Sequence, residues 1–207
     1  MEQNMKQIDI QEIINDTMKE FDEYEEYEDC EGKGAGISLS FESINSINNI
    51  DLKKLSWLYI YNNEITNIDN IDFKDLTDID LSNNKIENID NVNFKNIEWV
   101  RLDNNRIKNI NNVDFNNIKT LYLSGNLISN IDKVDFKNID SLHLYNNNIE
   151  NINGKNLIKL KYLELTGNPL FNSSLDILET LKEKGIEVIY EQNTQKNFIE
   201  KLIDKIS

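Results

Sequence analysis

Apolar and polar positions recur with a fixed step of 21 residues along most of the chain. One polar position sets the register, and apolar residues stand five and three positions before it and two positions after it. Six copies carry Asn at this position, namely Asn63, Asn84, Asn105, Asn126, Asn147 and Asn168. Self-similarity at a fixed step is the signature of stacked repeat architectures. Residues 36–170 are therefore expected to form one array of about seven copies.

The apolar–x–apolar core of each copy has the two-residue period of a short β-strand with one buried face. Strands that recur every 21 residues must run parallel, because each one returns by a crossover. No single copy can bury its apolar face alone, so neighbouring copies must stack into a solenoid. At about 4.8 Å per strand, such a sheet is roughly 30 Å wide.

The segment 76–86 reads LTDIDLSNNKI, which matches the pattern L-x-x-L-x-L-x-x-N-x-I. On these residues the chain resembles a leucine-rich repeat protein with short, 21-residue bacterial repeats of the internalin type. The resemblance covers residues 36–170. It implies an α/β solenoid with a curved parallel sheet on its concave side, short irregular or 3₁₀ segments on its convex side, and helical caps at both ends.

The six repeated asparagines are interpreted as a structural ladder rather than a functional site. A buried Asn side chain can pair with turn N–H and C=O groups that no regular strand pairing reaches. Loss of one is expected to leave buried polar groups unpaired, at a cost of about 1–3 kcal/mol. A Phe that stands ten residues after the Asn in four copies is expected to fill the convex side of the core.

Residues 1–35 are expected to form an acidic N-terminal cap, since a solenoid exposes its terminal cores. An amphipathic helix is predicted there from the apolar positions Ile10, Ile13, Ile14, Met18 and Phe21. This helix would cover the first repeat.

Residues 171–207 are expected to form a C-terminal cap with a helix, a strand over 186–190 and a final helix over about 194–206. Ser173 and Asp176 are spaced as a pair that caps the first of these helices, and Gly185 ends it. The final helix carries one apolar stripe, formed by Phe198, Ile199, Leu202, Ile203 and Ile206. It is expected either to pack back on the cap or to bind a partner.

Candidate function lies on the concave face, where strand residues between the buried positions point outward. These positions stand six, four and two residues before each repeated Asn. They make up about a tenth of the chain, yet they hold both Trp, five of the eight Tyr and the single His. Trp, Tyr and Arg dominate binding hot spots, and an exposed aromatic patch marks an interaction face. The preference of strands for aromatic residues explains part of the enrichment.

The residues of this face predicted to bind a partner are Trp57, Tyr59, Tyr61, Asp78, Asp80, Trp99, Arg101, Asp103, Tyr122, His143, Tyr145, Tyr162 and Glu164. Four of them are acidic and one is Arg, so the face favours a basic partner. His143 is interpreted as a contact residue rather than a base. A cation held by Asp78, Asp80 and Asp103 is disfavoured because no further ligands are in sight, so neither a metal nor a cofactor is predicted.

The formal charge of −15 is concentrated near the N-terminus, since residues 1–36 hold 12 acids and 3 Lys, a net of −9, and the remainder carries −6. Residues 20–31 hold eight acids in twelve positions, interrupted by aromatic residues. This stretch is either a solvated helix end or an acidic-aromatic hook that enters a cationic groove on another protein. Under the second interpretation the contact residues are Glu23, Tyr24, Glu25, Glu26, Tyr27 and Glu28.

Composition argues against several classes of protein. A single Cys cannot form an internal disulfide, which excludes a disulfide-stapled secreted scaffold. The first residues lack the basic and apolar regions of a signal peptide, and no apolar stretch is long enough to span a membrane. A chain this acidic is repelled by phosphate backbones, so nucleic acid is not an expected ligand. A monomer in the cytoplasm, or in the host-cell cytoplasm if the protein is phage-encoded, is expected.

No Ser, His and acidic residues cluster in the sequence as a catalytic set, so an enzyme is not expected. The favoured hypothesis is a protein–protein interaction module, namely an acidic inhibitor or immunity-type protein that blocks a basic, nucleic-acid-handling protein with a cationic substrate groove. The ribonuclease-inhibitor branch of the repeat family offers an analogy at the level of fold alone. The alternative is an internalin-like adhesion or scaffold protein that binds a surface partner.

Overall fold

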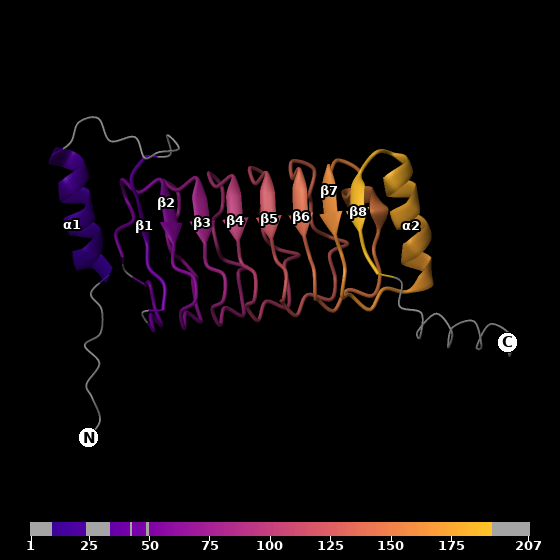
Figure 1. The fold of residues 1–207 in the computed structure, drawn as a ribbon, viewed down its shortest axis with the longest axis horizontal. Helices are drawn as coiled ribbons and strands as arrows, with labels where there is room; N and C mark the ends of the chain where they lie inside the picture. Colours follow the sequence, from indigo (N-terminus) through magenta and orange to yellow (C-terminus); the bar gives the residue numbers. More distant parts are fainter. Residues whose placement is uncertain (1–9, 24–33, 42, 49, 192–207) are drawn as a thin grey trace, which may run out of the picture.

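A single parallel sheet of eight three-residue strands runs through the molecule in chain order (Figure 1). The computed structural model describes residues 10–23, 34–41, 43–48 and 50–191. The strands are β1 (Gly36–Ser38), β2 (Trp57–Tyr59), β3 (Asp78–Asp80), β4 (Trp99–Arg101), β5 (Thr120–Tyr122), β6 (Ser141–His143), β7 (Tyr162–Glu164) and β8 (Glu187–Ile189). Each strand residue from β1 to β6 pairs with the residue 21 positions further on, as in Gly36 with Trp57. The predicted parallel solenoid is confirmed.

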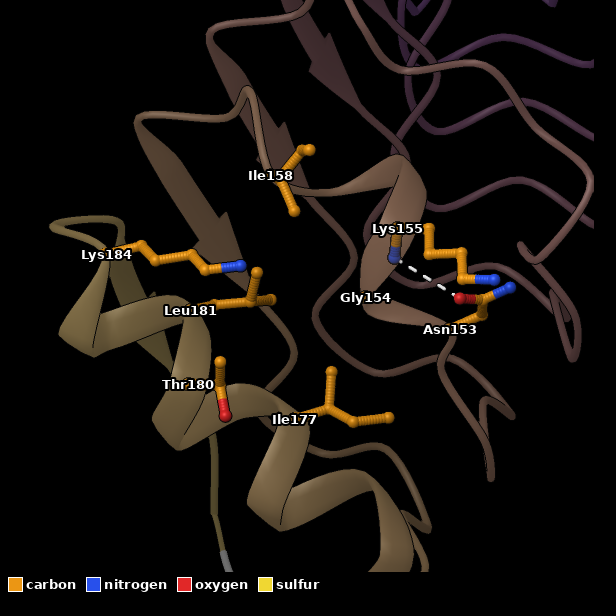
Figure 2. Close-up of a pocket in the computed structure, with 8 residues that line it drawn as sticks. All are labelled: Asn153, Gly154, Lys155, Ile158, Ile177, Thr180, Leu181 and Lys184. Carbon is orange, nitrogen blue, oxygen red and sulfur yellow. Dashed lines mark hydrogen bonds between the residues drawn. The ribbon is translucent and has the colours of Figure 1, made fainter.

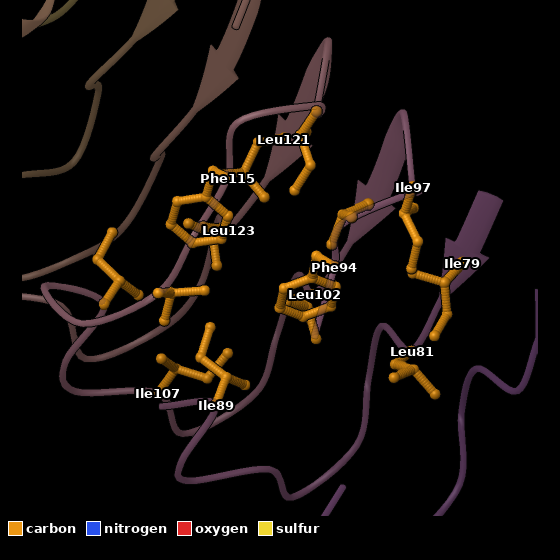
Figure 3. Close-up of a cluster of buried hydrophobic side chains, with 14 of the residues drawn as sticks. Ile79, Leu81, Ile89, Phe94, Ile97, Leu102, Ile107, Phe115, Leu121 and Leu123 are labelled. Carbon is orange, nitrogen blue, oxygen red and sulfur yellow. The ribbon is translucent and has the colours of Figure 1, made fainter. Parts of the chain in front are cut away.

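The core is a stack of identical layers, one from each repeat. The central residue of each strand from β2 to β7 is fully buried and faces the convex side. Opposite these residues lies a column of phenylalanine rings, and successive rings stack with centroids 6.2 to 6.5 Å apart. The members of the column are Phe73, Phe94, Phe115 and Phe136. Figure 3 shows two of these rings, Phe94 and Phe115, between the strands and the convex segments. Burial of each Phe side chain contributes about 1.5–3 kcal/mol to the free energy of unfolding.

The repeated asparagines form the ladder that the sequence predicts. In the middle of the array, Asn84 Oδ1 accepts a hydrogen bond from the Ile65 N–H at 2.9 Å. Its Nδ2 donates to the carbonyl oxygens of Ile60 at 2.8 Å and of Leu81 at 3.1 Å. The same pattern recurs in the next four repeats, and all six asparagines are buried. Each Asn therefore joins its own turn to the preceding repeat, and the structural interpretation is confirmed.

The residue immediately before each ladder Asn has a left-handed backbone. Its φ lies between 51° and 75° in Asn62, Asn83, Asn104, Gly125, Asn146 and Gly167. Asn and Gly are the residues that tolerate this conformation, which explains why Asn doublets and Gly-Asn pairs recur in the sequence. In the first repeat the same position holds Phe41, with φ of 61°. Phe41 is also 78% exposed.

Further asparagines close the turns on the convex side. Asn67, Asn88, Asn109 and Asn130 each accept a hydrogen bond on Oδ1 from the N–H two residues later. Such Asx turns let a short polar side chain replace a backbone acceptor. The single 3₁₀ helix among the described residues, η1 (Gly154–Asn156), closes the last repeat in the same region.

Helices close both ends of the array, as predicted. Helix α1 (Ile10–Glu23) buries Ile10 and Ile14 at the N-terminal end, and Gln11 Oε1 accepts a 2.7 Å hydrogen bond from the Asp51 N–H. Helix α2 (Asn172–Glu183) follows the last repeat, and the chain then forms β8 beside β7. No helix among the described residues is both long and apolar enough to cross a membrane. The predicted final helix over 194–206 lies outside the described residues.

One predicted detail of the C-terminal cap is wrong. Helix α2 begins at Asn172, and Phe171 occupies the N-cap position without a side-chain hydrogen bond, so Ser173 and Asp176 do not cap the helix. Ser174 instead turns inward. Its Oγ donates to the Glu150 carbonyl at 3.3 Å and accepts from the Ile152 N–H at 3.2 Å. This serine ties the helix to the last repeat, whereas Gly185, with φ of 88°, ends the helix region as predicted.

Candidate protein-binding face

A continuous row of aromatic rings crosses the concave face from β2 to β7. We call it the aromatic stripe, and it consists of Trp57, Tyr59, Trp99, Tyr122, His143 and Tyr162. Successive ring centroids lie 4.8, 6.0, 5.6, 4.3 and 4.8 Å apart. These separations fall in the range of favourable aromatic pairs. The sequence predicts each member, and the structure adds that neighbouring members touch and hold one another in place.

The stripe crosses β3 because the residues there are short. Strand β3 presents Asp78 and Asp80 to the concave side, so the ring of Tyr59 on β2 reaches the ring of Trp99 on β4 over them. The stripe uses two rows of the register, because Trp57 pairs through Asp78 with Trp99, whereas Tyr59 pairs with Asp80 in the neighbouring row. A continuous aromatic surface thus arises from a sequence in which one repeat lacks an aromatic residue.

Trp57 anchors the N-terminal end of the stripe. Its Nε1 donates to the Gly34 carbonyl oxygen at 3.1 Å. The indole lies flat against Gly36 on β1, where a Cβ atom would lie 2.0 Å from the ring. Gly36 therefore provides the space that the indole occupies. Sequence reasoning missed this role, although the register that pairs Gly36 with Trp57 contains the signal.

Arg101 lies beside the stripe, and its positive charge is balanced by carboxylates of the same chain. Its Nε lies 2.9 Å from Asp103 Oδ2, its Nη1 lies 3.9 Å from Asp80 Oδ2, and its guanidinium carbon lies 5.7 Å from the Tyr122 ring centroid. Burial acts to lower the pKa of Arg101, but the hydrogen bond to Asp103 and the charges of both carboxylates outweigh it and raise the pKa. The guanidinium is therefore a fixed charge whose partners belong to the chain itself.

The expectation that Asp80 and Asp103 are freely exposed is wrong. Both residues are buried, at 8% and 7% exposure. Asp80 Oδ1 accepts from the Ser82 N–H at 2.8 Å, and Asp103 Oδ1 accepts from the Ser124 N–H at 2.7 Å. These hydrogen bonds and Arg101 turn the two carboxylates inward. No group of three or more His, Cys, Asp or Glu among the described residues is arranged to hold a metal ion.

The side chains of Ser141, His143 and Glu164 meet at the C-terminal end of the stripe. The sequence alone did not predict that a Ser, a His and an acidic residue come together. Ser141 Oγ lies 3.0 Å from His143 Nε2, and His143 Nδ1 lies 3.4 Å from Glu164 Oε2. The order hydroxyl, imidazole, carboxylate is that of a nucleophile activated by a base. An oxyanion site is needed as well, and the Ser141 N–H already donates to the Lys119 carbonyl. The cluster therefore orients His143 within the stripe.

The same end of the stripe is acidic. Burial, together with the negative charges of Glu164 and Glu187, raises the pKa of Tyr162 above its ordinary value. Glu164 is half-buried, and Glu187 on the adjacent edge strand is exposed. A cation that approached this end would meet two carboxylates and the faces of two aromatic rings.

The other residues predicted to contact a partner lie beside the stripe, at the end of α1, or outside the described residues. Tyr145 is exposed and Tyr61 is half-buried, both at the strand ends that border the stripe. Glu23 is the last residue of α1. Its side chain, and Tyr24, Glu25, Glu26, Tyr27 and Glu28, lie outside the described residues, so the acidic-aromatic hook stays a prediction. Phe41 is an exposed aromatic residue at the end of the first repeat that the sequence analysis did not single out.

Comparisons with known proteins agree with this geometry. Two family descriptions match, "Leucine Rich repeats (2 copies)" over residues 53–93 and "Leucine Rich Repeat" over residues 117–139. An internalin (inlF) from Listeria monocytogenes is 27% identical with a TM-score of 0.67, over 76% of this chain and 48% of that one. An internalin C2 (inlC2) from the same species is 20% identical with a TM-score of 0.58, over 76% and 80% of the two chains.

A Shigella effector leucine-rich repeat domain is 14% identical with a TM-score of 0.57, over 85% of this chain and 88% of that one. At such identities, the matches to internalin C2 and to the effector domain show the fold alone. The chain spans about half the length of the internalin inlF structure. No curated protein matches it. The repeats and these neighbours support a protein–protein interaction module, and the fold is typical of non-enzymatic scaffolds.

Proposed function

Because the chain is a leucine-rich repeat protein with short, internalin-like repeats, we propose that it is an inhibitor or immunity-type protein that blocks a basic, nucleic-acid-handling protein. The observation that carries this proposal is the aromatic stripe. Six rings in mutual contact on the concave face form one binding surface for the partner. The acidic segment around residues 20–31 adds charge to the same interaction.

The stripe has the features of a binding hot spot. Its residues are half-buried, so each ring keeps part of its surface for a partner while its position is fixed by its neighbours. Fixed aromatic side chains lose little conformational entropy on binding, which leaves more of the contact energy as affinity. With strands about 4.8 Å apart, a stripe from β2 to β7 is roughly 24 Å long, enough for a helix or an extended segment of a partner.

Charge selects a basic partner. Arg101 pairs with Asp80 and Asp103 in a group with one more acid than base, and Asp78, Glu164 and Glu187 add further negative charge on and beside this face. The whole chain carries −15. Proteins that handle nucleic acid present cationic grooves to phosphate backbones, and an acidic surface competes for such a groove. Occupation of the groove by the chain would exclude the nucleic acid.

The test is a comparison of three baits in host lysate, at about 50 mM and about 500 mM salt. The first bait is the natural chain. The second carries Trp99→Ala and Tyr122→Ala, which interrupt the stripe at its centre. The third carries Leu127→Ala, a change of an exposed apolar residue outside the stripe. We expect the first and third baits to retain the same basic protein at low salt, and the second to bind it about tenfold more weakly or worse.

Purified partner then completes the test. A molar excess of the chain should lower the activity of the partner on nucleic acid, and high salt should restore that activity because exposed charge pairs are screened. Equal affinity of the first two baits for the partner would overturn the role of the stripe. A neutral or acidic partner, or one whose activity the chain leaves unchanged, would overturn the inhibitory function.

A second candidate function is internalin-like adhesion or scaffolding, favoured by the similarity to the internalin inlF structure. It uses the same stripe but a different partner. Binding of the labelled chain to intact cells, abolished by the stripe variant and weakly dependent on salt, would favour this function over the first. Binding confined to a basic lysate protein would favour inhibition.

A further inference from the structure

The aromatic stripe ends at Tyr162, next to the last strand of the sheet. Each inner ring of the stripe has an aromatic neighbour on both sides, as Tyr122 has Trp99 and His143. Tyr162 contacts His143 at 4.8 Å between ring centroids, and no other ring among the described residues contacts it. On its other side lies β8, the edge strand of the sheet. The side of Tyr162 that faces β8 is therefore not covered by an aromatic ring.

Strand β8 brings a carboxylate and an apolar side chain to this side of Tyr162. The register pairs Glu187 with Tyr162 and Ile189 with Glu164. Both β8 residues are exposed, Ile189 to 41%, whereas the residue between them is buried in the core. We call Tyr162, Glu164, Glu187 and Ile189 the edge site. It combines an aromatic ring, two carboxylates and an apolar surface at the end of the stripe.

The described residues supply no basic side chain of Lys or Arg to the edge site. Glu187 takes part in no ion pair among them, and Glu164 Oε2 lies 3.4 Å from His143 Nδ1. Lys161, immediately before β7, pairs instead with Asp140, with 3.0 Å between Nζ and Oδ2. The negative charge of the edge site is therefore available to a cation of a partner.

The chain itself shows how one ring and two carboxylates hold a guanidinium. Arg101 lies with its guanidinium carbon 5.7 Å from the centroid of the Tyr122 ring, and it pairs with both Asp103 and Asp80. This group stands at the centre of the stripe. The edge site has the same components, an aromatic ring and two carboxylates, but no arginine of the described residues.

We propose that the edge site binds an arginine side chain of the partner protein. The guanidinium lies against the ring of Tyr162 and donates to the carboxylates of Glu164 and Glu187. The methylene groups of the arginine pack on Ile189. Arginine fits this site better than lysine, because a planar guanidinium stacks on a ring and donates to two carboxylates at once. This inference rests on the proposed function, since it names the basic group that the partner of the stripe supplies.

Isolated amino-acid derivatives test the edge site without a partner protein. The probe is Nα-acetyl-arginine methylamide, titrated into the natural chain and followed by the NMR signals of the Tyr162 ring. We expect shifts that saturate. Nα-acetyl-citrulline methylamide has nearly the same shape and no charge, and it should give no saturating shift. The corresponding lysine derivative should bind about threefold more weakly or worse.

Two variants and one distant site provide the comparison. Glu187→Gln should raise the dissociation constant of the arginine probe about threefold or more, as expected from the loss of an ion pair. Glu183→Gln removes the same charge at an exposed position of α2 and should leave the constant unchanged. A groove of about 440 Å³ lies between α2 and η1, and Figure 2 shows Lys155 and Lys184 beside it. Because these lysines repel a cation, the NMR signals of Ile177 in the groove should not move.

Four results would overturn the edge site. They are no saturating shift of the Tyr162 signals at about 100 mM probe, equal shifts with the citrulline derivative, equal affinity for the lysine derivative, and unchanged affinity in Glu187→Gln. The lysate baits test the proposed function separately. A neutral or acidic partner would overturn that function and leave arginine binding intact. A basic partner, together with no binding of the probe, would overturn the edge site alone.

Discussion

Gly36 and Trp57 face each other on adjacent strands, and the indole occupies the volume that any side chain at position 36 would need. A Cβ atom there would lie 2.0 Å from the ring, well inside van der Waals contact. Because Trp57 is also held by the Gly34 carbonyl, the ring has a single position at the start of the aromatic stripe. The space left by one glycine therefore fixes the ring at the N-terminal end of the aromatic stripe.

Substitution of Gly36 by Ala should displace the Trp57 ring and disorder the N-terminal end of the stripe. The expected cost is about 1–3 kcal/mol of unfolding free energy, typical of an overpacked contact. Tryptophan fluorescence should shift to longer wavelength as the ring gains water contact. Ser38→Ala, at an exposed position of the same strand, is the control and should change neither quantity. Unchanged fluorescence in Gly36→Ala would contradict the observed contact.

The Asn ladder gives a second prediction. Asn105→Ala should remove the acceptor for the Ile86 N–H and the donor to the carbonyls of Leu81 and Leu102. Each buried group left unpaired costs about 1–3 kcal/mol, so urea denaturation should show a loss at least of that size. Asn112→Ala, at an exposed turn position of the same repeat, should cost less than about 0.5 kcal/mol. Equal losses in the two variants would show that the ladder is not selectively important.

The ladder and the strands were predictable because a 21-residue period repeats each local choice several times. Asn105 occupies the same environment as its five counterparts, so one interpretation accounts for all of them. The ends of the array lack that repetition. Ser173 had a plausible capping partner in sequence, but the inward turn of Ser174 toward Glu150 was decided by packing against the last repeat. A single sequence does not encode that competition in any local pattern.

Prediction of the concave face succeeded for positions and failed for exposure. The alternation along each strand placed Asp80 and Asp103 correctly on this side. Their burial results from Arg101, whose side chain pairs with both, and from N–H groups contributed by the turns. The contacts of Tyr59 with Trp99 across β3 likewise depend on the lengths of side chains from three strands. Such contacts follow from three-dimensional neighbours rather than from the alternation itself.

The fold should be less stable with Phe41 at this position than with the Asn or Gly that other repeats carry there. It adopts the left-handed backbone that other repeats assign to Asn or Gly, and its side chain is mostly exposed. Phe41→Asn should therefore raise the unfolding free energy by about 1 kcal/mol, because a non-glycine, non-asparagine residue is strained there. Phe41→Ala keeps the strained backbone and removes the ring, so its stability should stay close to that of the natural chain. Destabilisation by Phe41→Asn would show that the ring contributes to packing after all.

Tyr162 should make stability fall at high pH. Burial and the charges of Glu164 and Glu187 disfavour the phenolate and raise the pKa of Tyr162 above its ordinary value of 10.0. Below pH 10 the folded and unfolded states both keep the proton, and the contribution is fully present. Above pH 10 the unfolded chain loses the proton first, so the contribution is lost as pH rises through the raised pKa. Absorbance at about 295 nm, the phenolate band, should show a late-titrating tyrosine that is missing in Tyr162→Phe.

Glu164→Gln tests the cause of this raised pKa, because it keeps the size of the side chain and removes one of the charges that act on Tyr162. The pKa of Tyr162 should then move down toward its ordinary value. The loss of stability at high pH should therefore extend over a narrower pH range. Glu183→Gln, at an exposed position of α2, should leave the titration unchanged. A tyrosine that titrates identically in the Glu164 and Glu183 variants would contradict a direct electrostatic influence of Glu164 on the stripe.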